Sequence, residues 1–491
     1  MSKDHRDNVM FARKCLHYLS RDLLTPGAKA LAGRLDQALR RGEYAVFNSL
    51  CSDTEYLRTD TDYAEVYERC QVASLIRFPL VDLDPDAEIS RQREAVRECR
   101  ISPNASDLVI LRDAGRILTD WLDPIVGCRQ SSWFHRYLRH GPGVVSETSD
   151  NVTKRKVVWV PRRIRRFESL LPLISEEIRW REAHSRTILV PKDHKSLRTI
   201  AAEPCWTQWV QQGVRGAMEM GISMHPILSR MISLRDQTQQ HRRLVKGACT
   251  IDLSNASDTI KVKHLLLLKL PLEQRDFLLS LRTPMTEFKA TLIPTQGLFP
   301  MGAAVCFPFE SAFFSALCFA WCNAECPGMR PSSLGVYGDD IIVPEHLGGG
   351  LCRFLQRCGF SPNVNKTFIG TPFLESCGKY LYKGRDITPV KLKKRPPVSE
   401  ADESNIAFAL YALRLSERGF PTLGSFIQSR VKFKSSVRWN HKLHRLEQTK
   451  LVVSPRLVRG NPFFYPEALL HGSCDVALST ITVRHGWEPI L

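Results

Sequence analysis

The chain has 491 residues, 43% hydrophobic and 24% charged, which suits a large multi-lobed globular protein and excludes a disordered one. Its 69 lysines and arginines outnumber 51 aspartates and glutamates, so the net charge of +18 indicates a polyanionic partner such as nucleic acid, with a basic ribosome-associated or membrane-surface protein as the alternative. Fifteen scattered cysteines without a CxxC pair argue against a disulfide framework and for reduced thiols in the cytosol.

The amino-terminal segment "MSKDHRDNVMFARKCLHYLS" is too polar for the hydrophobic part of a secretory signal. The most hydrophobic stretch, 303–322, is interrupted by Pro308 and Glu310, which leaves about a dozen apolar residues, too few to span a bilayer. We therefore expect a soluble, intracellular protein without membrane association. Residues 1–140 are predicted to be mostly helical, because segments such as "SDLVILRDAGRILTDWL" repeat apolar residues at helical spacing.

A basic segment follows the Gly-Pro-Gly turn of "RHGPGVVS" (139–146). This segment, "KRKVVWVPRRIRRF" (154–167), contains seven basic residues and no acid. It is either a solvated basic face or one wall of a groove for a phosphate backbone, where Trp159 and Phe167 would give apolar support. On the second reading, the candidate RNA contacts are Lys154, Arg155, Lys156, Arg162, Arg163, Arg165 and Arg166.

The middle of the chain mixes predicted strands and helices. "RTILVPKDHKSLRTIAAEP" (186–204) has two β-branched runs around a basic loop, and helical patterning returns at 205–245. "CTIDLSNASDTI" (249–260) is typical of a strand and a turn, and it precedes the apolar helix "KHLLLLKL". After the loop "LIPTQGLFPMGAAV", the helix "FESAFFSALCFAWC" begins a stripe of Cys318, Cys322 and Cys326. Core packing explains this stripe better than a metal site.

The stretch "VYGDDIIVP" (336–344) predicts a β-hairpin, because β-branched and aromatic residues surround a Gly-Asp turn. A helix, "GGLCRFLQRCGF", and a second hairpin, "SCGKYLYKGRDITPV", are predicted beyond it. The last hundred residues are basic and are predicted to be helical. The strands and helices of 248–390, flanked by helical parts, predict an α+β fold.

Three acids stand out in this core. Asp252 ends a short apolar strand, and Asp339 and Asp340 occupy the predicted hairpin tip. An acidic surface turn is the alternative for the hairpin pair alone. If the strand and the hairpin are neighbours in one sheet, three carboxylates meet, and such like charges require a cation. Oxygen ligands of this kind suit Mg²⁺, and two ions would stabilise the attacking and leaving oxygens of a phosphoryl transfer.

The series "DLSNASD", "PMGAAVCFPFES", "VYGDD", "GFSPNVNKTF" and "FLESCGKYLYKGRDITP" resembles palm motifs A to E of viral RNA-dependent RNA polymerases. With "HGPG", "VPKDHKSLRTIAAEP" as finger motif F and "DQTQQHRR", residues 139–390 resemble the replicase catalytic (beta) subunit of the single-stranded RNA bacteriophages, the levivirus group. The resemblance implies a right-hand polymerase, an α+β fold of fingers, palm and thumb with an antiparallel palm sheet that carries the catalytic acids.

The resemblance also implies four regions. Residues 1–140 would be a helical region contributing to the fingers and the thumb bridge, and 141–247 would be fingers with the basic nucleotide-entry motif. Residues 248–390 would be the palm with a fingers insertion near 270–295, and 391–491 the thumb and a basic helical C-terminal region.

The implied chemistry assigns roles to the acids and to one lysine. Asp252, Asp339 and Asp340 would bind two Mg²⁺ ions, for which Mn²⁺ can substitute, while a 3′-hydroxyl attacks the α-phosphate of a nucleotide. Lys366 occupies the position from which a lysine protonates the departing pyrophosphate, with a surface salt bridge as the alternative.

The resemblance implies that Lys192, Lys195 and Arg198 clamp the nucleotide phosphates, with a solvated loop as the alternative. Glu203 would orient one of these bases through an ion pair. Asp258 would hydrogen-bond a ribose hydroxyl, or cap the following helix, or do both.

Met301 and Gly302 would open a loop close to template and nucleotide, since glycine permits close backbone approach. Many relatives carry Asn or Ser next, as a partner to the ribose-reading acid, whereas this chain has Ala303. Lys379 and Lys383 of the second predicted hairpin are candidate RNA contacts. Glu310, within an apolar helix, has only a structural role on sequence grounds.

The implied activity is replication of a viral positive-strand RNA genome in the cytoplasm of an infected bacterium. Implied partners are template and product RNA, ribonucleoside triphosphates, host elongation factors Tu and Ts, and a ribosomal RNA-binding protein. A narnavirus- or ourmiavirus-like polymerase is the viral alternative, and a reverse transcriptase is disfavoured by Gly338 and by Asp258 at the place of an aromatic gate. An inactive RNA-binding or scaffold subunit is the alternative from another class, and the intact set of three acids disfavours it.

Overall fold

The structure, a computed structural model, describes residues 3–127, 132–141, 143–148, 154, 157–171, 179–399, 402, 404–432, 438–440, 445–448 and 451–453. The chain divides into two units. Unit 1 comprises Met1–Leu83, Pro191–Ser196 and Ile387–Leu491, and unit 2 comprises Asp84–Val190 and Leu197–Asp386.

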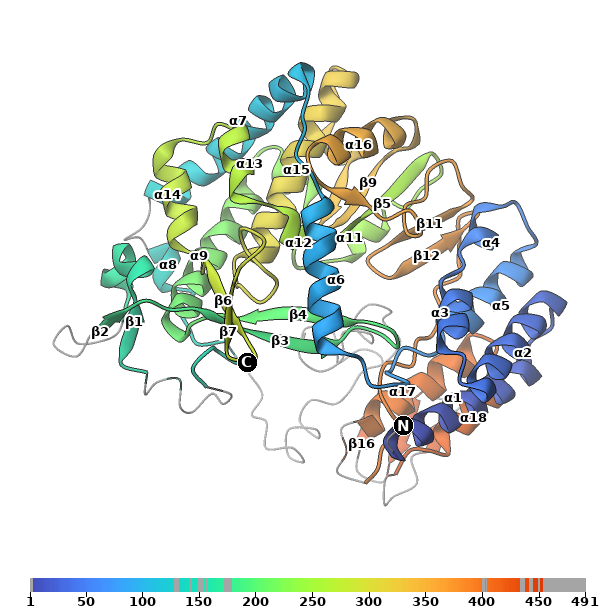
Figure 1. The fold of residues 1–491 in the computed structure, drawn as a ribbon. Coiled ribbons are helices and arrows are strands. Elements are labelled where there is room, and N and C mark those ends of the chain that lie inside the picture. The colour runs from blue at the N-terminus through green and yellow to red at the C-terminus, as the bar shows by residue number, and fades with distance from the viewer. Residues whose placement is uncertain are drawn as a thin grey trace. The chain divides into compact units, whose positions relative to one another are not determined.

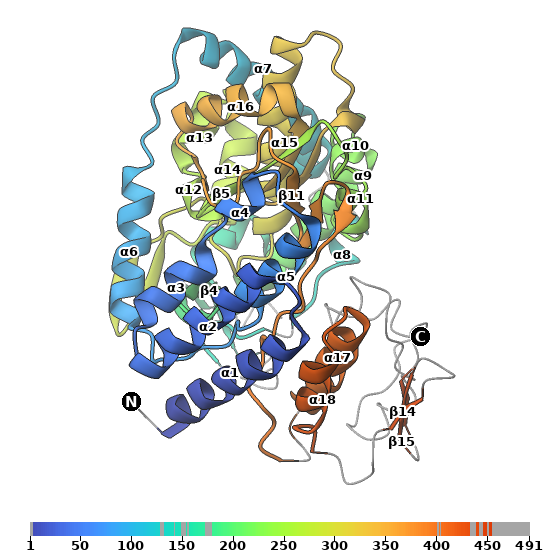
Figure 2. The same ribbon diagram turned by 90° about the vertical axis from the view of Figure 1, so that its right-hand side faces the viewer.

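Unit 1 is built from helices near both ends of the sequence (Figures 1 and 2). Phe11 stacks on Phe426 at a ring-centroid distance of 5.9 Å and also contacts Phe408, so the two groups of helices share one core. Both carboxylate oxygens of Asp22 accept hydrogen bonds from the first backbone N–H groups of α18, those of Thr422 and Leu423. The helices are α1 (Lys3–Asp22), α2 (Pro26–Arg41), α3 (Tyr44–Ser52), α4 (Glu55–Arg58), α5 (Tyr63–Ser74), α17 (Ser404–Glu417) and α18 (Pro421–Gln428).

The prediction of a helical C-terminal region is correct for α17 and α18 and wrong for residues 438–440, 445–448 and 451–453, which are the described residues beyond 432. Short strands β14 (Arg438–Asn440), β15 (Arg445–Gln448) and β16 (Leu451–Val453) form an antiparallel sheet. Only three or four residues lie in each strand, and Trp and Val favour extended backbone, which outweighs the helical appearance of the charged residues.

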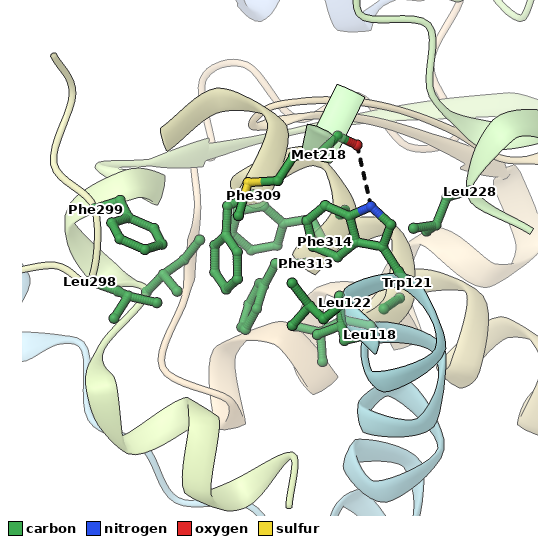
Figure 3. Packing of buried hydrophobic residues seen from close by; sticks show 14 of the residues in the cluster. Leu118, Trp121, Leu122, Met218, Leu228, Leu298, Phe299, Phe309, Phe313 and Phe314 are labelled. Carbon is green, nitrogen blue, oxygen red and sulfur yellow. Dashed lines mark hydrogen bonds between the residues drawn. The ribbon is translucent and has the colours of Figure 1, made fainter. Parts of the chain in front are cut away.

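Unit 2 has a helical core of aromatic and aliphatic side chains (Figure 3). Trp121 on α7 is buried against Phe309 on α15, and its indole N–H donates to the carbonyl of Met218 on α9 (3.3 Å). The helices are α6 (Pro85–Glu98), α7 (Ala105–Gly127), α8 (Ser132–His135), η2 (Arg162–Leu170), α9 (Cys205–Met224), α10 (Leu228–Met231), α11 (Thr238–His241), α12 (Ala256–Thr259), α13 (Val262–Leu267), α14 (Leu272–Ser280), α15 (Cys306–Glu325), η4 (Pro331–Ser333) and α16 (Glu345–Arg357).

The described residues of unit 2 form four sheets. The central one has the strand order β10-β5-β9-β8 and is antiparallel throughout, and an antiparallel meander is formed by β11-β12-β13. A sheet of order β4-β3-β6-β7 and the small parallel pair β1-β2 complete the set. The strands are β1 (Trp159–Pro161), β2 (Arg179–Arg181), β3 (Ser185–Pro191), β4 (Leu197–Ala202), β5 (Ala248–Ser254), β6 (Met285–Phe288), β7 (Thr291–Pro294), β8 (Gly335–Tyr337), β9 (Asp340–Pro344), β10 (Ser361–Pro362), β11 (Phe373–Ser376), β12 (Lys379–Tyr382) and β13 (Arg385–Asp386).

These elements confirm the predicted mixture of helices with antiparallel sheets. Cys318 and Cys322 are fully buried in α15, so these two members of the cysteine stripe pack in the core as expected, whereas Cys326 is partly exposed at the end of the helix. Across the described ranges, no helix is both long enough and apolar enough to cross a bilayer.

Candidate active site

The central sheet brings the three acids together along the backbone. β5 runs antiparallel to β9 with Asp252 directly opposite Asp340, and Tyr337 of β8 also pairs with Asp340. Gly338 and Asp339 therefore form the predicted hairpin turn. Gly338 has a φ of 63°, which favours glycine, and its N–H donates to the hydroxyl of Ser311 (3.0 Å). The strand and the hairpin are thus sheet neighbours.

The two strand acids have different partners. Asp252 is 8% exposed, and its Oδ1 lies 3.0 Å from the ammonium of Lys366. Asp340 Oδ2 accepts a hydrogen bond from the backbone N–H of Cys377 (3.0 Å). Burial, followed by the charges of Glu375, Asp339 and Asp252, raises the pKa of Asp340 well above its ordinary value.

Lys366 is the cation bonded to Asp252, and its side chain is about half exposed. Burial lowers the pKa of this lysine, but the negative charges of Asp252 and Glu375 outweigh burial and raise it above its ordinary value. The lysine therefore stays protonated at neutral pH. The predicted alternative, a salt bridge, is present, and it joins Lys366 to one of the three acids.

The carboxylates of Asp252 and Asp340 bond to different partners although their backbones are paired. Within the described ranges, no three His, Cys, Asp or Glu side chains are grouped closely enough to hold a metal ion. The donor set nevertheless fits a hard divalent cation, because it offers three carboxylates, and burial with the neighbouring negative charges raises the pKa of Asp340, an effect that a bound cation would oppose.

Two further acids influence this site, and the sequence reasoning did not assign them to it. Burial and the charges of Asp339 and Asp258 raise the pKa of Glu310 on α15 well above its ordinary value. After burial, the negative charge of Glu375 on β11 has the largest effect in raising the pKa of Asp340. The polar residue within an apolar helix was a signal for Glu310, whereas the position of Glu375 depends on how two sheets pack.

The segment "DQTQQHRR" (236–243) holds the β8-β9 hairpin through side-chain hydrogen bonds. Gln237 donates to the hydroxyl of Tyr337 (3.0 Å), and the buried Gln240 donates to the carbonyl oxygen of Asp340 (3.3 Å). A Cβ atom on Gly335 would lie 2.6 Å from Gln240, so glycine is needed for this contact. The hairpin that carries two acids is thus fixed at both its strands.

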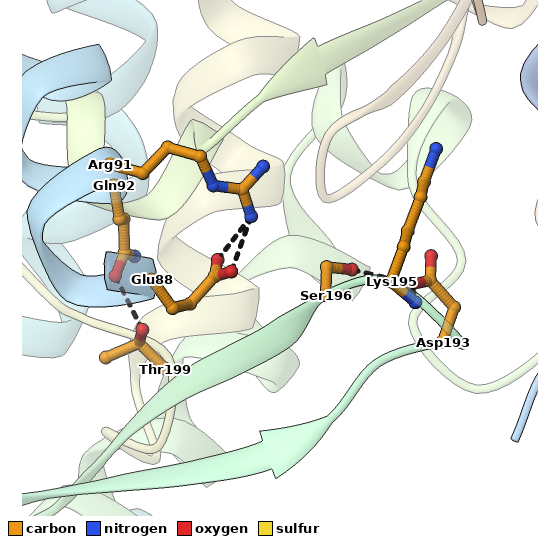
Figure 4. Close-up of polar contacts among 7 residues, drawn as sticks. All are labelled: Glu88, Arg91, Gln92, Asp193, Lys195, Ser196 and Thr199. Atoms are coloured by element: carbon orange, nitrogen blue, oxygen red, sulfur yellow. Dashed lines mark hydrogen bonds and ion pairs between the residues drawn. The ribbon is translucent and has the colours of Figure 1, made fainter. Parts of the chain in front are cut away.

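Asp258 lies in α12 and is bonded to α6. Its Oδ2 accepts from the amide nitrogen of Gln92 (2.6 Å), and burial raises the pKa of Asp258 to about 6. The alternative that Asp258 caps the following helix is wrong, because Lys261 is the N-cap residue of α13. Figure 4 shows Gln92 with Thr199, whose hydroxyl donates to the other end of the amide (2.5 Å).

The loop of Met301 and Gly302 lies against β4. The carbonyl oxygen of Met301 accepts from the N–H of Ala201 (2.8 Å), and Gly302 has a φ of 108°. A Cβ atom on Gly302 would lie 2.2 Å from the carbonyl oxygen of Ala201, so the close approach of this loop to β4 requires glycine, and its predicted approach to template and nucleotide stays a prediction. Ala303 is buried and adds no polar side-chain atom.

The basic segment 154–167 is only partly exposed. The prediction that Lys154 contacts RNA is wrong for this structure, because Lys154 is 1% exposed and its ammonium donates to the carbonyl oxygens of Gly141 and Gly143. Nothing in the sequence of the basic segment indicated that Lys154 would donate hydrogen bonds to two glycines of "HGPG". Arg162, Arg163 and Arg165 are exposed, Arg166 is half-buried, and Arg155 and Lys156 lie outside the described residues.

Two basic side chains of this segment, the exposed Arg165 and the half-buried Arg166, lie over aromatic rings. The Arg165 guanidinium lies 5.8 Å from the ring centroid of Trp180, and that of Arg166 lies 5.7 Å from that of Phe277. The predicted aromatic support is confirmed for Phe167, which lies 5.9 Å from the Arg166 guanidinium, whereas Trp180 and Phe277 were not predicted and the role of Trp159 stays a prediction.

The finger loop is divided between the two units. Lys192 and Lys195 are exposed and belong to unit 1, where Lys195 donates to the hydroxyl of Ser52 and the buried His194 packs edge-on against Phe47. Burial lowers the pKa of His194 to about 4, so its ring is neutral and apolar in character. Arg198 is exposed on β4 of unit 2.

Glu203 is 1% exposed and follows β4. Its carboxylate accepts from the hydroxyl of Thr283, and no ion pair is formed by Glu203 within the described ranges, so the predicted ion pair to a finger-loop base is wrong. Burial raises its pKa to about 7, and the nearby charge of Arg282 offsets only part of that effect.

This raised pKa predicts a pH-dependent stability. Because the folded-state pKa of Glu203 exceeds its ordinary value of 4.5, its contribution to stability is present at low pH and is lost as the pH rises through about 7. In the wild type, this effect lowers the free energy of unfolding by on the order of 2 kcal/mol between about pH 5 and 8, and we expect Glu203→Gln to remove that decrease. Thermal unfolding across that range measures it, with the exposed Glu168→Gln as the control, which should keep the wild-type slope.

The meander β11-β12-β13 contains the second predicted hairpin. Lys379 pairs with Asp386, so much of its charge is already neutralised. Lys383 is exposed at the next turn, with its ammonium 5.4 Å from the ring centroid of Tyr382. Of these two predicted RNA contacts, Lys383 is thus the more accessible.

Comparison with known proteins identifies the family of the chain. A sequence model described as "RNA replicase, beta-chain" matches residues 145–401, more than half of the chain. The chain belongs to the RNA replicase beta-chain family. The matched range contains Asp252, Asp258, Asp339, Asp340 and Lys366, whereas α6 with Gln92 lies before it.

Curated members of the replicase family are similar over part of their length. The chain is 36% identical over 217 residues to the RNA-directed RNA polymerase subunit beta of Qbeta virus (strain MX1), covering 43% of this chain and 36% of that one. It is 30% identical over 272 residues to the RNA-directed RNA polymerase beta chain of Escherichia phage MS2, covering 53% and 47%. The chain therefore matches less than half the length of these relatives.

Solved polymerase structures align more weakly. One described as an "RdRp complex" gives a TM-score of 0.45 at 10% identity, over 83% of this chain and 40% of that one. A human picobirnavirus RNA-dependent RNA polymerase with its insertion loop deleted gives 0.42 at 11% identity, over 82% and 84%. Scores this low carry no argument, so membership of the replicase family rests on sequence.

Proposed function

We propose that the chain is an RNA-dependent RNA polymerase that replicates a viral positive-strand RNA genome by adding ribonucleotides to a 3′-hydroxyl with release of pyrophosphate. The observation that carries the proposal is the register of β5 and β9, which sets Asp252 opposite Asp340 beside Asp339, in a member of the replicase family. A scaffold protein gains nothing from holding these like charges together, since their repulsion costs stability.

Asp252, Asp339 and Asp340 would hold two divalent cations, Mg²⁺ or in its place Mn²⁺. Such ions would activate the attacking 3′-hydroxyl and stabilise the charge on the leaving pyrophosphate. Asp252 would exchange its bond to Lys366 for a cation, which frees the ammonium. Lys366 would then hold a proton close to the leaving group, because the neighbouring acids keep it charged.

The remaining assignments concern substrates. Lys192, Lys195 and Arg198 would contact nucleotide phosphates, and Met301 and Gly302 would line the nucleotide site. Asp258 would accept a hydrogen bond from the ribose. Arg162, Arg163, Arg165, Arg166 and Lys383 would contact RNA phosphates, and their exposure or aromatic support favours this role.

The domain division follows the same proposal. Residues 248–390 would be the palm with a fingers insertion near 270–295, which contains the hairpin β6-β7, and 141–247 the fingers. Residues 1–140 and 391–491 would contribute the bridge and the thumb of a right-hand polymerase. The names of the relatives describe a subunit, so we propose that the chain acts with host proteins, including elongation factors Tu and Ts and a ribosomal RNA-binding protein, in the cytoplasm of an infected bacterium.

The test is RNA-templated synthesis by the full-length chain isolated with the bacterial proteins that co-purify with it. Labelled ribonucleotide should enter a product that requires added RNA template and divalent cation and that is destroyed by ribonuclease. Template binding without any incorporation, in the presence of Mg²⁺ or Mn²⁺, would instead identify an RNA-binding subunit.

A further inference from the structure

Gln92 joins three segments of unit 2 that are distant in sequence. Its amide nitrogen donates to Asp258 Oδ2 of α12 (2.6 Å), and its amide oxygen accepts from the hydroxyl of Thr199 on β4 (2.5 Å; Figure 4). Gln92 itself lies on α6, before the range that matches the family. The amide thus connects a candidate ribose-binding acid to a strand of another sheet.

The direction of the amide is fixed by its two partners. An ionised carboxylate only accepts hydrogen bonds, so the amide NH₂ must face Asp258. The hydroxyl of Thr199 supplies the donor that the amide oxygen needs, and a flipped amide would lose the bond to Asp258. Within the described residues, Asp258 Oδ1 has no hydrogen-bond partner, and Asp258 is partly exposed. One oxygen is held and the other is available to a ligand.

The surroundings of Asp258 are packed tightly enough to keep it in place. A Cβ atom on Gly297 would lie 2.4 Å from the carbonyl oxygen of Ser257, so the loop 297–302 closes directly onto the α12 backbone. The same loop bonds to β4 through Met301 and Ala201. Because Ala303 brings no polar atom, Gln92 is the side chain that orients the acid.

We infer that Gln92 is a positioning residue for sugar recognition, and that it holds Asp258 with Oδ1 placed to accept a hydrogen bond from the 2′-hydroxyl of the incoming ribonucleotide. This inference rests on the proposed polymerase function. A 2′-deoxynucleotide cannot make that bond, so the site discriminates ribose from deoxyribose through a residue of α6.

The decisive variant is Gln92→Leu, which keeps the approximate volume of the side chain and removes both hydrogen bonds. We expect the ratio of kcat/KM for ATP to that for dATP to fall about tenfold. The KM for ATP should rise, while kcat for ATP and both constants for dATP change little, because the acid only loses its orientation. Thr199→Val should change the ratio in the same direction by less, and Thr199→Ser should restore it.

The matched control is Arg91→Ala. Arg91 is the neighbour of Gln92 on α6, and this variant removes the surface ion pair of Arg91 with Glu88. It should leave the ratio unchanged. Wild-type protein that makes no RNA would refute the proposed function itself. An active wild type whose Gln92→Leu and Thr199→Val variants keep the wild-type ratio would refute the role of Gln92 alone. If Gln92→Leu does not fold, Thr199→Val decides the matter.

Discussion

Replacing Asp340 with asparagine should abolish RNA synthesis and at the same time stabilise the metal-free protein. Burial and then the charges of Glu375, Asp339 and Asp252 raise the pKa of Asp340, so its contribution to stability is present at low pH and is lost as the pH rises. Asparagine removes this loss and can still accept from the N–H of Cys377. We expect a higher melting temperature at neutral pH, and a fall in activity of at least about a hundredfold.

Asp339→Asn is the matched comparison, because Asp339 is the exposed neighbour in the same turn. It should abolish activity equally and leave the melting temperature almost unchanged. Melting curves with and without Mg²⁺ complete the test, since a bound ion should stabilise the wild type and neither variant. Equal RNA synthesis by Asp340→Asn and wild type would remove the proposed mechanism.

RNA affinity should fall steeply with salt. Each phosphate that a basic side chain neutralises releases counterions, so a site with about six contacts loses about a thousandfold in affinity between about 50 and 200 mM salt. The exposed arginines Arg162, Arg163 and Arg165 are placed to make such contacts. Filter binding or fluorescence anisotropy at several salt concentrations measures the slope of log K against log salt.

Substitution separates these arginines from the general charge of the chain. Arg162→Gln with Arg163→Gln should reduce the salt slope by about two, since each contact contributes about 0.9. Arg116→Gln removes one positive charge from an exposed side chain that pairs with Asp113, and it should leave the slope unchanged, whereas either arginine substitution alone should lower the slope by about 0.9. A flat dependence in the wild type would contradict the role of the basic segment in RNA binding.

Features with a local signal were predictable from the sequence. The hairpin at 336–344 follows from β-branched residues around a Gly-Asp turn, and the strand before Asp252 follows from its apolar residues. The helices of residues 1–140 follow from their periodicity, whereas the strands of 438–453 are too short to show one.

Features that depend on tertiary packing were not predictable. Gln92 bonds an acid 166 positions away, and nothing near either residue identifies the other. Lys154 is typical of a surface lysine in a basic run, yet the carbonyl oxygens of the preceding turn enclose its ammonium. For Glu310 the sequence indicated a need for a partner, but the acid beside it depends on where the hairpin packs.

The cap that Asp22 places on α18 has a consequence for synthesis on the ribosome. Asp22 at the end of α1 is synthesised 400 positions before Thr422, whose backbone N–H it binds in the folded protein. Phe11 is likewise synthesised long before Phe426, on which its ring stacks. The nascent amino-terminal helices therefore expose apolar surface while the intervening region folds, and they are the part of the chain for which a chaperone is most useful during translation.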